Sequence, residues 1–386
     1  MGGQILNKQP AYRDVRMSKS LSGDNFVIFG GASLQSLDMQ ISLDILDKSN
    51  GWYARAPSSR SGISPDALGS RSIALAGDVN NDNHEDMMIG DPINSRIYVL
   101  FGNSSGFYNL NQGFIILGET KSDYLGWSVA PAKDFNRDSF DDIIGCAIFK
   151  NACYLWFGHT LPFKNVQLPF NSNKEGIVII GSRGYSMMGI SVGSAGDFNG
   201  DGYVDLIISA IGRGNANIVY VLYGKVLGAT DTQISIDSLL QQEYFAVVGD
   251  IQTSIGGSVT WLGDVNGDGF DDVCFGSVPY RGGYTRQQSY LLFGGSLKFG
   301  TKFLRDLSYK EKLSIIGGGI VVSGPGDLNG DGFNDVIITN FMSWQTNPGA
   351  YLISFPSNMT VAPTMMPSST PTSAPQQPSS RPSIRG

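Results

Sequence analysis

Short apolar runs, separated by glycine-rich and acidic turns, recur along the chain in a fixed order. Each repeat has a run of small residues, an acidic loop, an apolar run and then two further strand-like runs. The third run is aromatic and apolar, as in Ile97–Gly102, and the fourth ends in glycine, as in Gly113–Gly118. Runs of this length that are rich in Ile, Val and aromatic residues predict β-strands. No run has the helical period over enough residues to predict a helical layer.

The acidic loop has nine residues and occurs five times, with Asp at positions 1, 5 and 9 and Asn at position 3. The loops begin at Asp78, Asp134, Asp197, Asp264 and Asp327, at intervals of 56, 63, 67 and 63 residues. A repeat of this size with four strands is typical of a propeller blade. We therefore predict an all-β fold, a β-propeller of four-stranded antiparallel blades.

The polar positions of each acidic loop predict a calcium site. Calcium takes about six to eight oxygen ligands, and positions 1, 3, 5 and 9 offer three carboxylates and one amide oxygen, with a backbone carbonyl near position 7. Position 6 must turn sharply, which suits Gly202, Gly269 and Gly332, is tolerated by Asn83 and fits Ser139 worst. The predicted ligands of up to five structural Ca²⁺ ions are Asp78, Asn80, Asp82, Asp86, Asp134, Asn136, Asp138, Asp142, Asp197, Asn199, Asp201, Asp205, Asp264, Asn266, Asp268, Asp272, Asp327, Asn329, Asp331 and Asp335.

Two other interpretations of the loops were weighed. An EF-hand needs Glu at position 12 and flanking helices, but position 12 is Ile, Gly or Phe here and strand-like runs follow. Turns of Asp, Asn and Gly also form without metal. Five loops with the same four polar positions favour metal sites over metal-free turns.

The pattern resembles the FG-GAP repeat of integrin α-subunit propellers. The FG element precedes the acidic loop at the spacing of that family, and the GAP element is found at 90–92 and 145–147 and is looser in later repeats. The FG elements are Leu68-Gly69, Leu125-Gly126, Met188-Gly189 and Ile255-Gly256. The resemblance covers residues 14 to 355 and implies a calcium-stabilised propeller. Similar propellers occur in the C-terminal part of glycosylphosphatidylinositol-specific phospholipase D and in microbial surface proteins.

The sequence leaves the number of blades open. Segment 13–31 aligns with the second and third strands of a blade, without an acidic loop before it, and no fourth strand is evident after the fifth loop. We count five loop-bearing blades plus a partial one, so the ring has six blades or an incomplete seven. The expected organisation is a disordered or truncated start (1–13), the propeller (14–355) and a disordered Pro/Ser/Thr-rich tail (356–386).

Charge and targeting signals bear on the location. The formal net charge is −7, and five bound Ca²⁺ ions would change it to +3. No basic stripe predicts nucleic-acid binding, no apolar run predicts a membrane span, and no signal peptide precedes the repeats. Multi-Asp sites of this kind fill at extracellular calcium levels, so we expect an extracellular or cell-surface protein, and the missing signal peptide agrees with a truncated N-terminus.

Smaller motifs add little to this picture. Sequons at Asn103 and Asn358 are compatible with a glycoprotein. Cys146 and Cys153 flank a predicted hairpin, and the sequence leaves open whether they pair or stay as buried thiols.

The sequence predicts no enzyme. The GxSxG motif at Gly189–Gly193 lacks the strand-to-helix turn of a nucleophile elbow, and its Ser191 stands where serines stand in the sister repeats. Of the two His residues, His84 stands at position 7 of the first acidic loop, where the backbone carbonyl is the expected donor, and His159 has no evident acid or nucleophile partner. A hydrolase needs convergent acid, base and electrophilic groups, and the sequence offers none outside the acidic loops.

We therefore predict a non-catalytic, calcium-binding adhesion or protein-interaction propeller with a protein or extracellular-matrix partner. Candidate binding loops on its upper surface are the longer ones, Gly158–Glu175, Gly224–Glu243 and Ser277–Gln288. Two alternatives stay open: an accessory propeller of a larger surface enzyme similar to the phospholipase, and a carbohydrate-binding propeller. A carbohydrate site would need aromatic residues in pockets between blades. Trp127, Trp156 and Trp261 lie in predicted strands, so we expect them to pack in the core.

Overall fold

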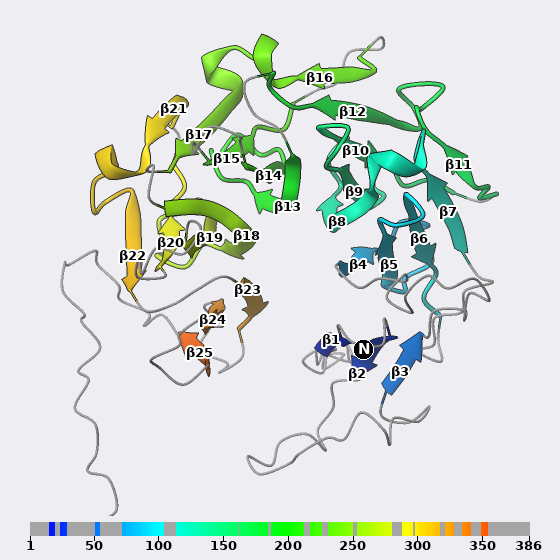
Figure 1. The fold of residues 1–386 in the computed structure, drawn as a ribbon, viewed down its shortest axis with the longest axis horizontal. Coiled ribbons are helices and arrows are strands. Elements are labelled where there is room, and N and C mark those ends of the chain that lie inside the picture. Colours follow the sequence, from blue (N-terminus) through cyan, green and yellow to red (C-terminus); the bar gives the residue numbers. More distant parts are fainter. Residues whose placement is uncertain are drawn as a thin grey trace, which may run out of the picture.

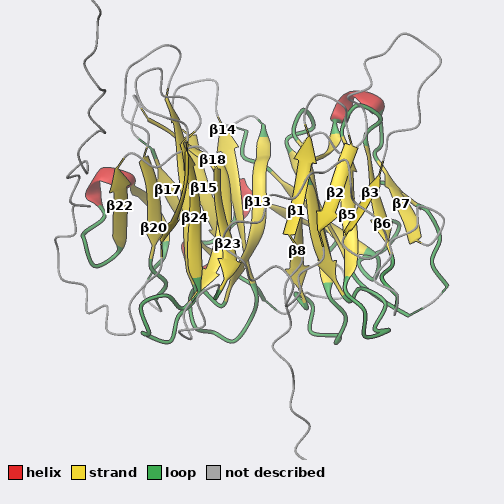
Figure 2. Cartoon of the chain, turned by 90° about the horizontal axis from the view of Figure 1, so that it is seen from below, coloured by secondary structure: helices red, strands yellow, loops and turns green. Residues whose placement is uncertain are grey.

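In the computed structural model, six β-sheets follow one another in chain order around a ring (Figure 1), as expected for a propeller. We name these sheets blades A to F. The structure describes residues 15–19, 24–28, 51–54, 72–103, 113–160, 162–183, 187–211, 217–225, 231–249, 253–279, 288–295, 298–316, 321–327, 334–340 and 349–353. The start at 1–13, the tail at 356–386, its Asn358 and most of the Ser277–Gln288 loop lie outside these ranges. Figure 2 shows the strands from the side, with the loops at the two ends of the sheets.

Blades B to E each have four consecutive strands in antiparallel order, as the sequence predicts. They are β4 (Ile73–Gly77), β5 (Asp86–Asp91), β6 (Arg96–Leu100) and β7 (Gly113–Leu117) in blade B; β8 (Leu125–Lys133), β9 (Asp142–Ala147), β10 (Ala152–Trp156) and β12 (Gly176–Ile180) in blade C; β13 (Met188–Gly196), β14 (Asp205–Ile211), β15 (Asn217–Leu222) and β17 (Tyr244–Val248) in blade D; and β18 (Thr253–Gly263), β19 (Asp272–Pro279), β20 (Gln288–Leu292) and β22 (Lys312–Ile316) in blade E.

The two terminal blades have three described strands each. Blade A has β1 (Val15–Lys19), β2 (Asp24–Ile28) and β3 (Gly51–Ala54), and blade F has β23 (Val321–Gly326), β24 (Asp335–Asn340) and β25 (Gly349–Ile353). β1 pairs antiparallel with β2, and β2 with β3. This order agrees with the prediction that segment 13–31 supplies a second and a third strand.

A fifth strand, which the sequence analysis did not predict, extends three of the blades at the outer edge. β11 (Val166–Gln167), β16 (Gln233–Ser235) and β21 (Gly300–Phe303) each come from the connection between the third and fourth strands of one blade. Each pairs in parallel with the fourth strand of the preceding blade, namely β7, β12 and β17. The donated strands cover edges that would otherwise present unpaired backbone groups.

Two of these donated strands lie within candidate binding loops. Gly158–Glu175 and Gly224–Glu243 contain β11 and β16, so they fasten one blade to the next instead of standing free. Both begin at a glycine whose amide bonds to the last Asp of the acidic loop. They therefore lie on the face of the acidic loops, whereas Ser277–Gln288 joins β19 to β20 at the opposite end.

The hydrophobic core lies between neighbouring blades, because each sheet packs one face on the next. Between blades C and D, for example, Ile144 and Ile179 of one sheet pack with Leu206 and Ile208 of the other, and all four side chains are fully buried. Equivalent clusters lie between blades B and C, D and E, and E and F. Trp156 is buried in one of them, as predicted.

The glycines of the FG elements in blades C, D and E let neighbouring blades approach closely. Gly126 of β8 has a φ of +89°, and a Cβ built there would lie 2.6 Å from the Arg96 carbonyl oxygen and 2.9 Å from the Asp91 amide nitrogen. Gly189 and Gly256 have φ values of +86° and +83° and lie equally close to the preceding blade. Only glycine adopts this conformation and leaves this space without strain.

Serines of the innermost strands tie neighbouring blades together. The Ser191 hydroxyl accepts a hydrogen bond from the Val259 amide at 3.0 Å, and the Ser258 hydroxyl accepts one from the Val322 amide at 3.2 Å. The Ser128 hydroxyl donates to the Gly189 carbonyl oxygen at 2.6 Å. Ser191 of the GxSxG motif thus has the same structural role as its sister serines.

Cys146 and Cys153, which the sequence left open, form a disulfide. They face each other across β9 and β10, with Cα atoms 4.0 Å apart. The disulfide lies under the FG glycine of the next blade, because a Cβ at Gly189 would be 2.5 Å from the Cys146 sulfur. The third cysteine, Cys274, is a buried thiol.

Candidate metal-binding loops

Each acidic loop joins the first strand of its blade to the second, and we name it after that blade. Loops B, C, D and E are described in full; of loop F, Asp327 and Asp335 are described, and Asn329 and Asp331 lie outside the described residues. The four complete loops share one backbone path, with left-handed residues at positions 4 and 6. These residues are Asn81, Asn83, Arg137, Ser139, Gly200, Gly202, Gly267 and Gly269. The turn at position 6 was predicted and the turn at position 4 was not.

The side chains at the odd positions form the same hydrogen bonds in all four loops. The position-1 carboxylate accepts from the position-6 amide at 2.7 to 3.0 Å. The position-3 amide oxygen accepts from the position-5 backbone amide at 2.9 to 3.0 Å, and its nitrogen donates to the position-5 carboxylate at 2.8 to 3.1 Å. The position-5 carboxylate accepts from the position-7 amide at 2.8 to 3.0 Å. Position 7 thus bonds to position 5 through its backbone N–H, and in loop B the His84 ring also contacts position 5, with Nδ1 3.1 Å from Asp82 Oδ1.

The Asp at position 9 is fully buried and ties three segments of its blade together. One carboxylate oxygen accepts from the position-2 amide at 2.9 to 3.0 Å, and the other accepts from the glycine amide after the third strand at 2.8 to 3.0 Å. Burial raises the pKa of Asp86 to about 7 and the pKa values of Asp142, Asp205 and Asp272 to about 8. The backbone hydrogen bonds lower these pKa values, and the other carboxylates of each loop raise them.

Neighbouring loops are also joined, through residues that the sequence analysis did not single out. Asp141, at position 8 of loop C, accepts a hydrogen bond from the Asp78 amide at 2.8 Å. Asp271, at position 8 of loop E, accepts one from the Asp197 amide at 2.8 Å. The signal in the sequence is an acid directly before position 9, together with a glycine directly before position 1 of the preceding loop. Burial raises the pKa of Asp141, the bond from Asp78 lowers it, and the carboxylates of Asp78 and Asp134 raise it.

The donors of each complete loop suit calcium by chemistry, because they are three carboxylates and one amide oxygen on one short turn. Within the described residues, no three His, Cys, Asp or Glu side chains converge closely enough to enclose an ion. Several of the carboxylate oxygens face amide groups of their own loop. In loop D, however, Asp197 Oδ1 is buried and has no hydrogen-bond partner within the described part of the chain. A buried carboxylate oxygen left unsatisfied is costly, and a bound cation would satisfy it.

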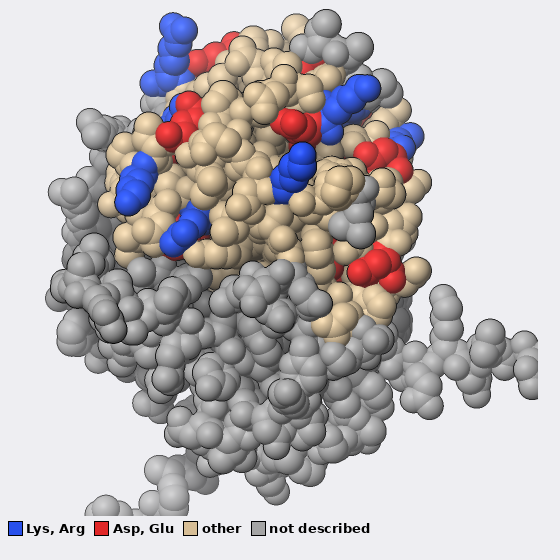
Figure 3. All heavy atoms as spheres, turned by 90° about the vertical axis from the view of Figure 1, so that its right-hand side faces the viewer, with Lys and Arg blue, Asp and Glu red and all other residues tan. Residues whose placement is uncertain are grey.

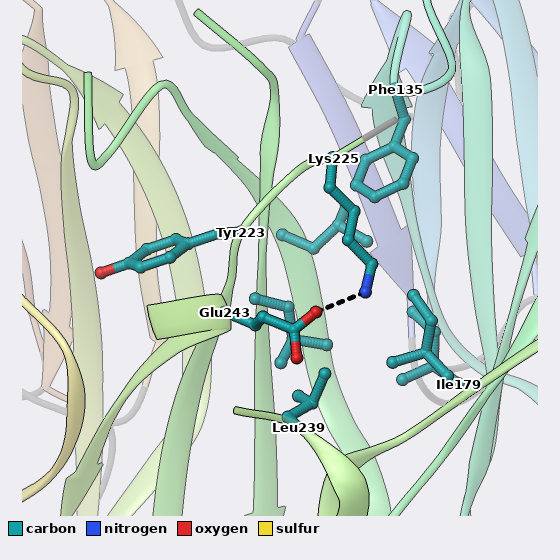
Figure 4. A pocket seen from close by; sticks show the side chains of 9 residues that line it. Phe135, Ile179, Tyr223, Lys225, Leu239 and Glu243 are labelled. Carbon is teal, nitrogen blue, oxygen red and sulfur yellow. Dashed lines mark hydrogen bonds and ion pairs between the residues drawn. The ribbon is translucent and has the colours of Figure 1, made fainter. Parts of the chain in front are cut away.

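A small cavity between blades C and D offers no comparable chemistry (Figure 4). Lys225 and Glu243 point toward each other at its mouth and form an ion pair with an N–O distance of 2.6 Å. Glu243 also accepts the Leu240 amide, and its pKa is lowered, chiefly by the bond from Lys225. The other lining side chains are Phe135, Ile179, Leu206, Leu222, Tyr223, Ile234 and Leu239. The cavity is therefore a packing feature closed by a satisfied ion pair.

The surface gives little further guidance. On the face seen in Figure 3, basic and acidic side chains are interspersed over the described residues and form no large patch of one sign. Asn103 of the first sequon follows the end of β6 after Phe101 and Gly102 and is only partly exposed. The described helices are 3₁₀ turns of three residues, η3 (Lys121–Asp123), η4 (Ile236–Ser238), η5 (Gln241–Glu243) and η6 (Leu304–Asp306). None of them has the length and apolar character to cross a bilayer.

The fold and the loops together define the class of the protein as a β-propeller whose blades carry acidic loops between their first and second strands. Comparison with known proteins agrees. The sequence model of the FG-GAP repeat family matches residues 188–222, which comprise the first three strands and the acidic loop of blade D. Integrin alpha-5 of Xenopus laevis is 28% identical over 225 residues, covering 55% of this chain and 20% of the relative.

Two further relatives match a similar part of the chain. Integrin alpha pat-2 of Caenorhabditis elegans is 28% identical over 219 residues, covering 52% of this chain and 17% of the relative. Phosphatidylinositol-glycan-specific phospholipase D of Bos taurus is 26% identical over 219 residues, covering 53% of this chain and 24% of the relative. The match therefore spans about a fifth of the length of these relatives. The chain contains an FG-GAP repeat at residues 188–222 and resembles the integrin α-subunits.

Proposed function

We propose that this propeller binds structural calcium in its acidic loops and acts outside the cell as a non-catalytic adhesion or protein-interaction module. The similarity to integrin α-subunits supports the adhesion role. The expected partner is a protein or an extracellular-matrix component. Bound calcium would supply positive charge among the clustered carboxylates of each loop, and so would stabilise the fold by linkage.

The observation that carries the proposal is the uniform frame of loops B to E. Four loops from different parts of the chain present the same three carboxylates and one amide on the same backbone turn. In loop D, the residues that would hold the ion are Asp197, Asn199, Asp201 and Asp205, and the buried unpartnered oxygen belongs to the first of them. Turns without metal would require the same hydrogen bonds within each loop. They would not require three carboxylates in every loop.

A count of bound ions tests the calcium sites. Asp201→Ala removes one predicted ligand from loop D and should lower the number of bound calcium ions by one. Asp306→Ala is the matched control, because Asp306 is an exposed acid outside the loops, and it should leave the count unchanged. An unchanged count in Asp201→Ala would remove loop D from the proposal.

A solid-phase binding assay tests the adhesion role. The purified chain should bind immobilised extracellular-matrix proteins in millimolar calcium and lose that binding in excess chelator. Binding that is absent in both conditions, from a chain that does bind calcium, would contradict the adhesion role and leave the metal sites standing.

The match to the phospholipase D supports a second candidate, an accessory propeller of a larger secreted or surface enzyme. The natural protein would then contain a catalytic domain in addition to residues 1–386. Mass spectrometry of the natural protein would separate the candidates, because peptides of a zinc-binding hydrolase domain would favour the enzyme. Carbohydrate binding, the further alternative, is tested by a glycan array with the same chain.

A further inference from the structure

Two pairs of neighbouring acidic loops are joined by the same two-bond clamp. Between loops B and C, the Asp141 amide donates to the Asp78 carbonyl oxygen at 3.3 Å, and an Asp141 carboxylate oxygen accepts from the Asp78 amide at 2.8 Å. Between loops D and E, Asp271 forms the same two bonds with Asp197, at 3.2 and 2.8 Å. In each pair, one residue therefore holds both backbone groups of the first residue in the preceding loop.

The chain makes room for this clamp with a glycine before position 1. Gly77 and Gly196 have φ values of +79° and +64°. A Cβ at Gly77 would lie 2.2 Å from a carboxylate oxygen of Asp141, and a Cβ at Gly196 would lie 1.9 Å from one of Asp271. No other side chain fits at these two positions while the clamp is closed.

The junction between loops C and D is built differently. Position 8 of loop D is Val204, and the residue before loop C is Lys133, so neither the acid nor the glycine of the clamp is present. Arg137 of loop C bridges the gap instead: its guanidinium lies 3.5 Å from the centroid of the Tyr203 ring and donates to the Gly202 carbonyl oxygen. This junction therefore leaves the backbone of Asp134 without a clamp from loop D.

We propose that Asp141 and Asp271 couple calcium binding in pairs, loop B with loop C and loop D with loop E, while the C and D loops bind independently. The inference rests on the proposed calcium sites. Asp141 directly precedes Asp142, the last ligand of loop C, so an ion in loop C fixes the backbone of Asp141. The clamp then holds Asp78, the first ligand of loop B, in place. By linkage, the effect is the same in both directions.

The two acids are positioning residues in this account, because each acts through the backbone of a ligand in the neighbouring loop. Calcium titration against a chromophoric chelator tests them directly. In Asp141→Ala, two of the bound ions should bind roughly tenfold more weakly, which corresponds to about 1.4 kcal/mol each. Asp271→Ala should likewise weaken two ions. Val204→Ala, at the same loop position without a clamp, should weaken none.

A conservative variant guards against loss of folding. Asp141→Asn keeps an oxygen that accepts the Asp78 amide, so it should keep the paired binding of the wild type. Weakening of a single ion or of none in Asp141→Ala, or the same pattern in Val204→Ala, would overturn the coupling. A wild-type chain that binds no calcium would overturn the proposed calcium sites as well, whereas normal ion counts with uncoupled variants would overturn the coupling alone.

Hydrogen exchange supplies a readout that does not depend on the titration. Asp138→Ala removes a ligand of loop C while its clamp residue stays in place. In millimolar calcium, the amides of loop B should then exchange faster than in the wild type, and those of loop D should not change. Faster exchange in loop D than in loop B would contradict the proposed pairing.

Discussion

The junction between loops B and C and the junction between loops C and D are joined by side chains of opposite charge that hold different positions of the neighbouring loop. At the first, the Asp141 carboxylate bonds to the Asp78 amide; at the second, Arg137 bonds to the Gly202 carbonyl and stacks on Tyr203. Away from the loops the two junctions agree, since both place an FG glycine against the preceding blade. The comparison shows that the repeat determines how the strands of neighbouring blades contact each other. The charge of the side chain that joins two neighbouring loops depends instead on a few positions within the loops.

The largest expected effect comes from substitution of the FG glycines, which both junctions share. Gly126→Ala and Gly189→Ala should each lower the free energy of unfolding by about 3 kcal/mol or more, because a left-handed backbone and a close contact are both violated. Gly267→Ala is the matched control: its φ is +73°, but nothing lies within 4 Å of a Cβ there. It should cost only about 1 kcal/mol. Equal losses in urea unfolding for all three variants would show that close packing at the FG glycines contributes nothing.

The next effect concerns the buried Asp at position 9. Asp142→Ala removes the carboxylate that accepts three backbone amides, those of Phe135, Asn136 and Gly158. In chelator, it should lower the free energy of unfolding by about 2 to 4 kcal/mol. Asp138→Ala in the same loop, an exposed residue, should cost less than about 1 kcal/mol under these conditions. A reversed order of the two variants in urea unfolding would contradict the structural role of Asp142.

The disulfide distinguishes the second junction from the first. Its Cys146 lies against Gly189 of blade D, in the place that Gly90 takes against Gly126 at the first junction. Reduction of the wild type should lower the free energy of unfolding by about 2 kcal/mol, by releasing a short closed loop. A chain with Cys146→Ser and Cys153→Ser should not respond to reductant. A response of equal size in that variant would point to another cause.

The smallest expected effect concerns Arg137, the cation that joins loops C and D where an acid joins loops B and C. Arg137→Ala removes a cation over a partly exposed aromatic ring and should cost about 0.5 to 1 kcal/mol. The loss should be measured by urea unfolding in chelator, with Tyr203→Leu as the companion variant. Because both variants break the same contact, their double variant should cost less than the sum of the two. Full additivity would mean that the contact between Arg137 and Tyr203 is not energetically significant.

The sequence was sufficient to predict the fold class, because the period, the four strand-like runs and the acidic loop recur together. It also predicted the left-handed turn at position 6, where Ser139 adopts a φ of +76° in spite of its side chain. The ring order of the blades follows from the repeat itself. The segment at 13–31 forms the paired strands β1 and β2, as its two apolar runs predict.

Other features were out of reach for physical reasons. The donated strands β11 and β16 have two and three residues, which is too few to show a period, so the sequence did not predict them. Pairing of Cys146 with Cys153 depends on the register of β9 and β10, which the spacing of the cysteines does not fix. The clamp of Asp141 on Asp78 joins residues 63 positions apart, and only the arrangement of neighbouring blades shows that they meet.

Thermal unfolding of the purified chain with and without calcium, with bound ions counted in the same sample, tests the central claim most directly. Calcium sites in the acidic loops predict four or five ions per chain and a large rise in the melting temperature. No bound calcium and no shift would mean that the loops are metal-free turns, and would contradict the account of this propeller as a calcium-stabilised extracellular module.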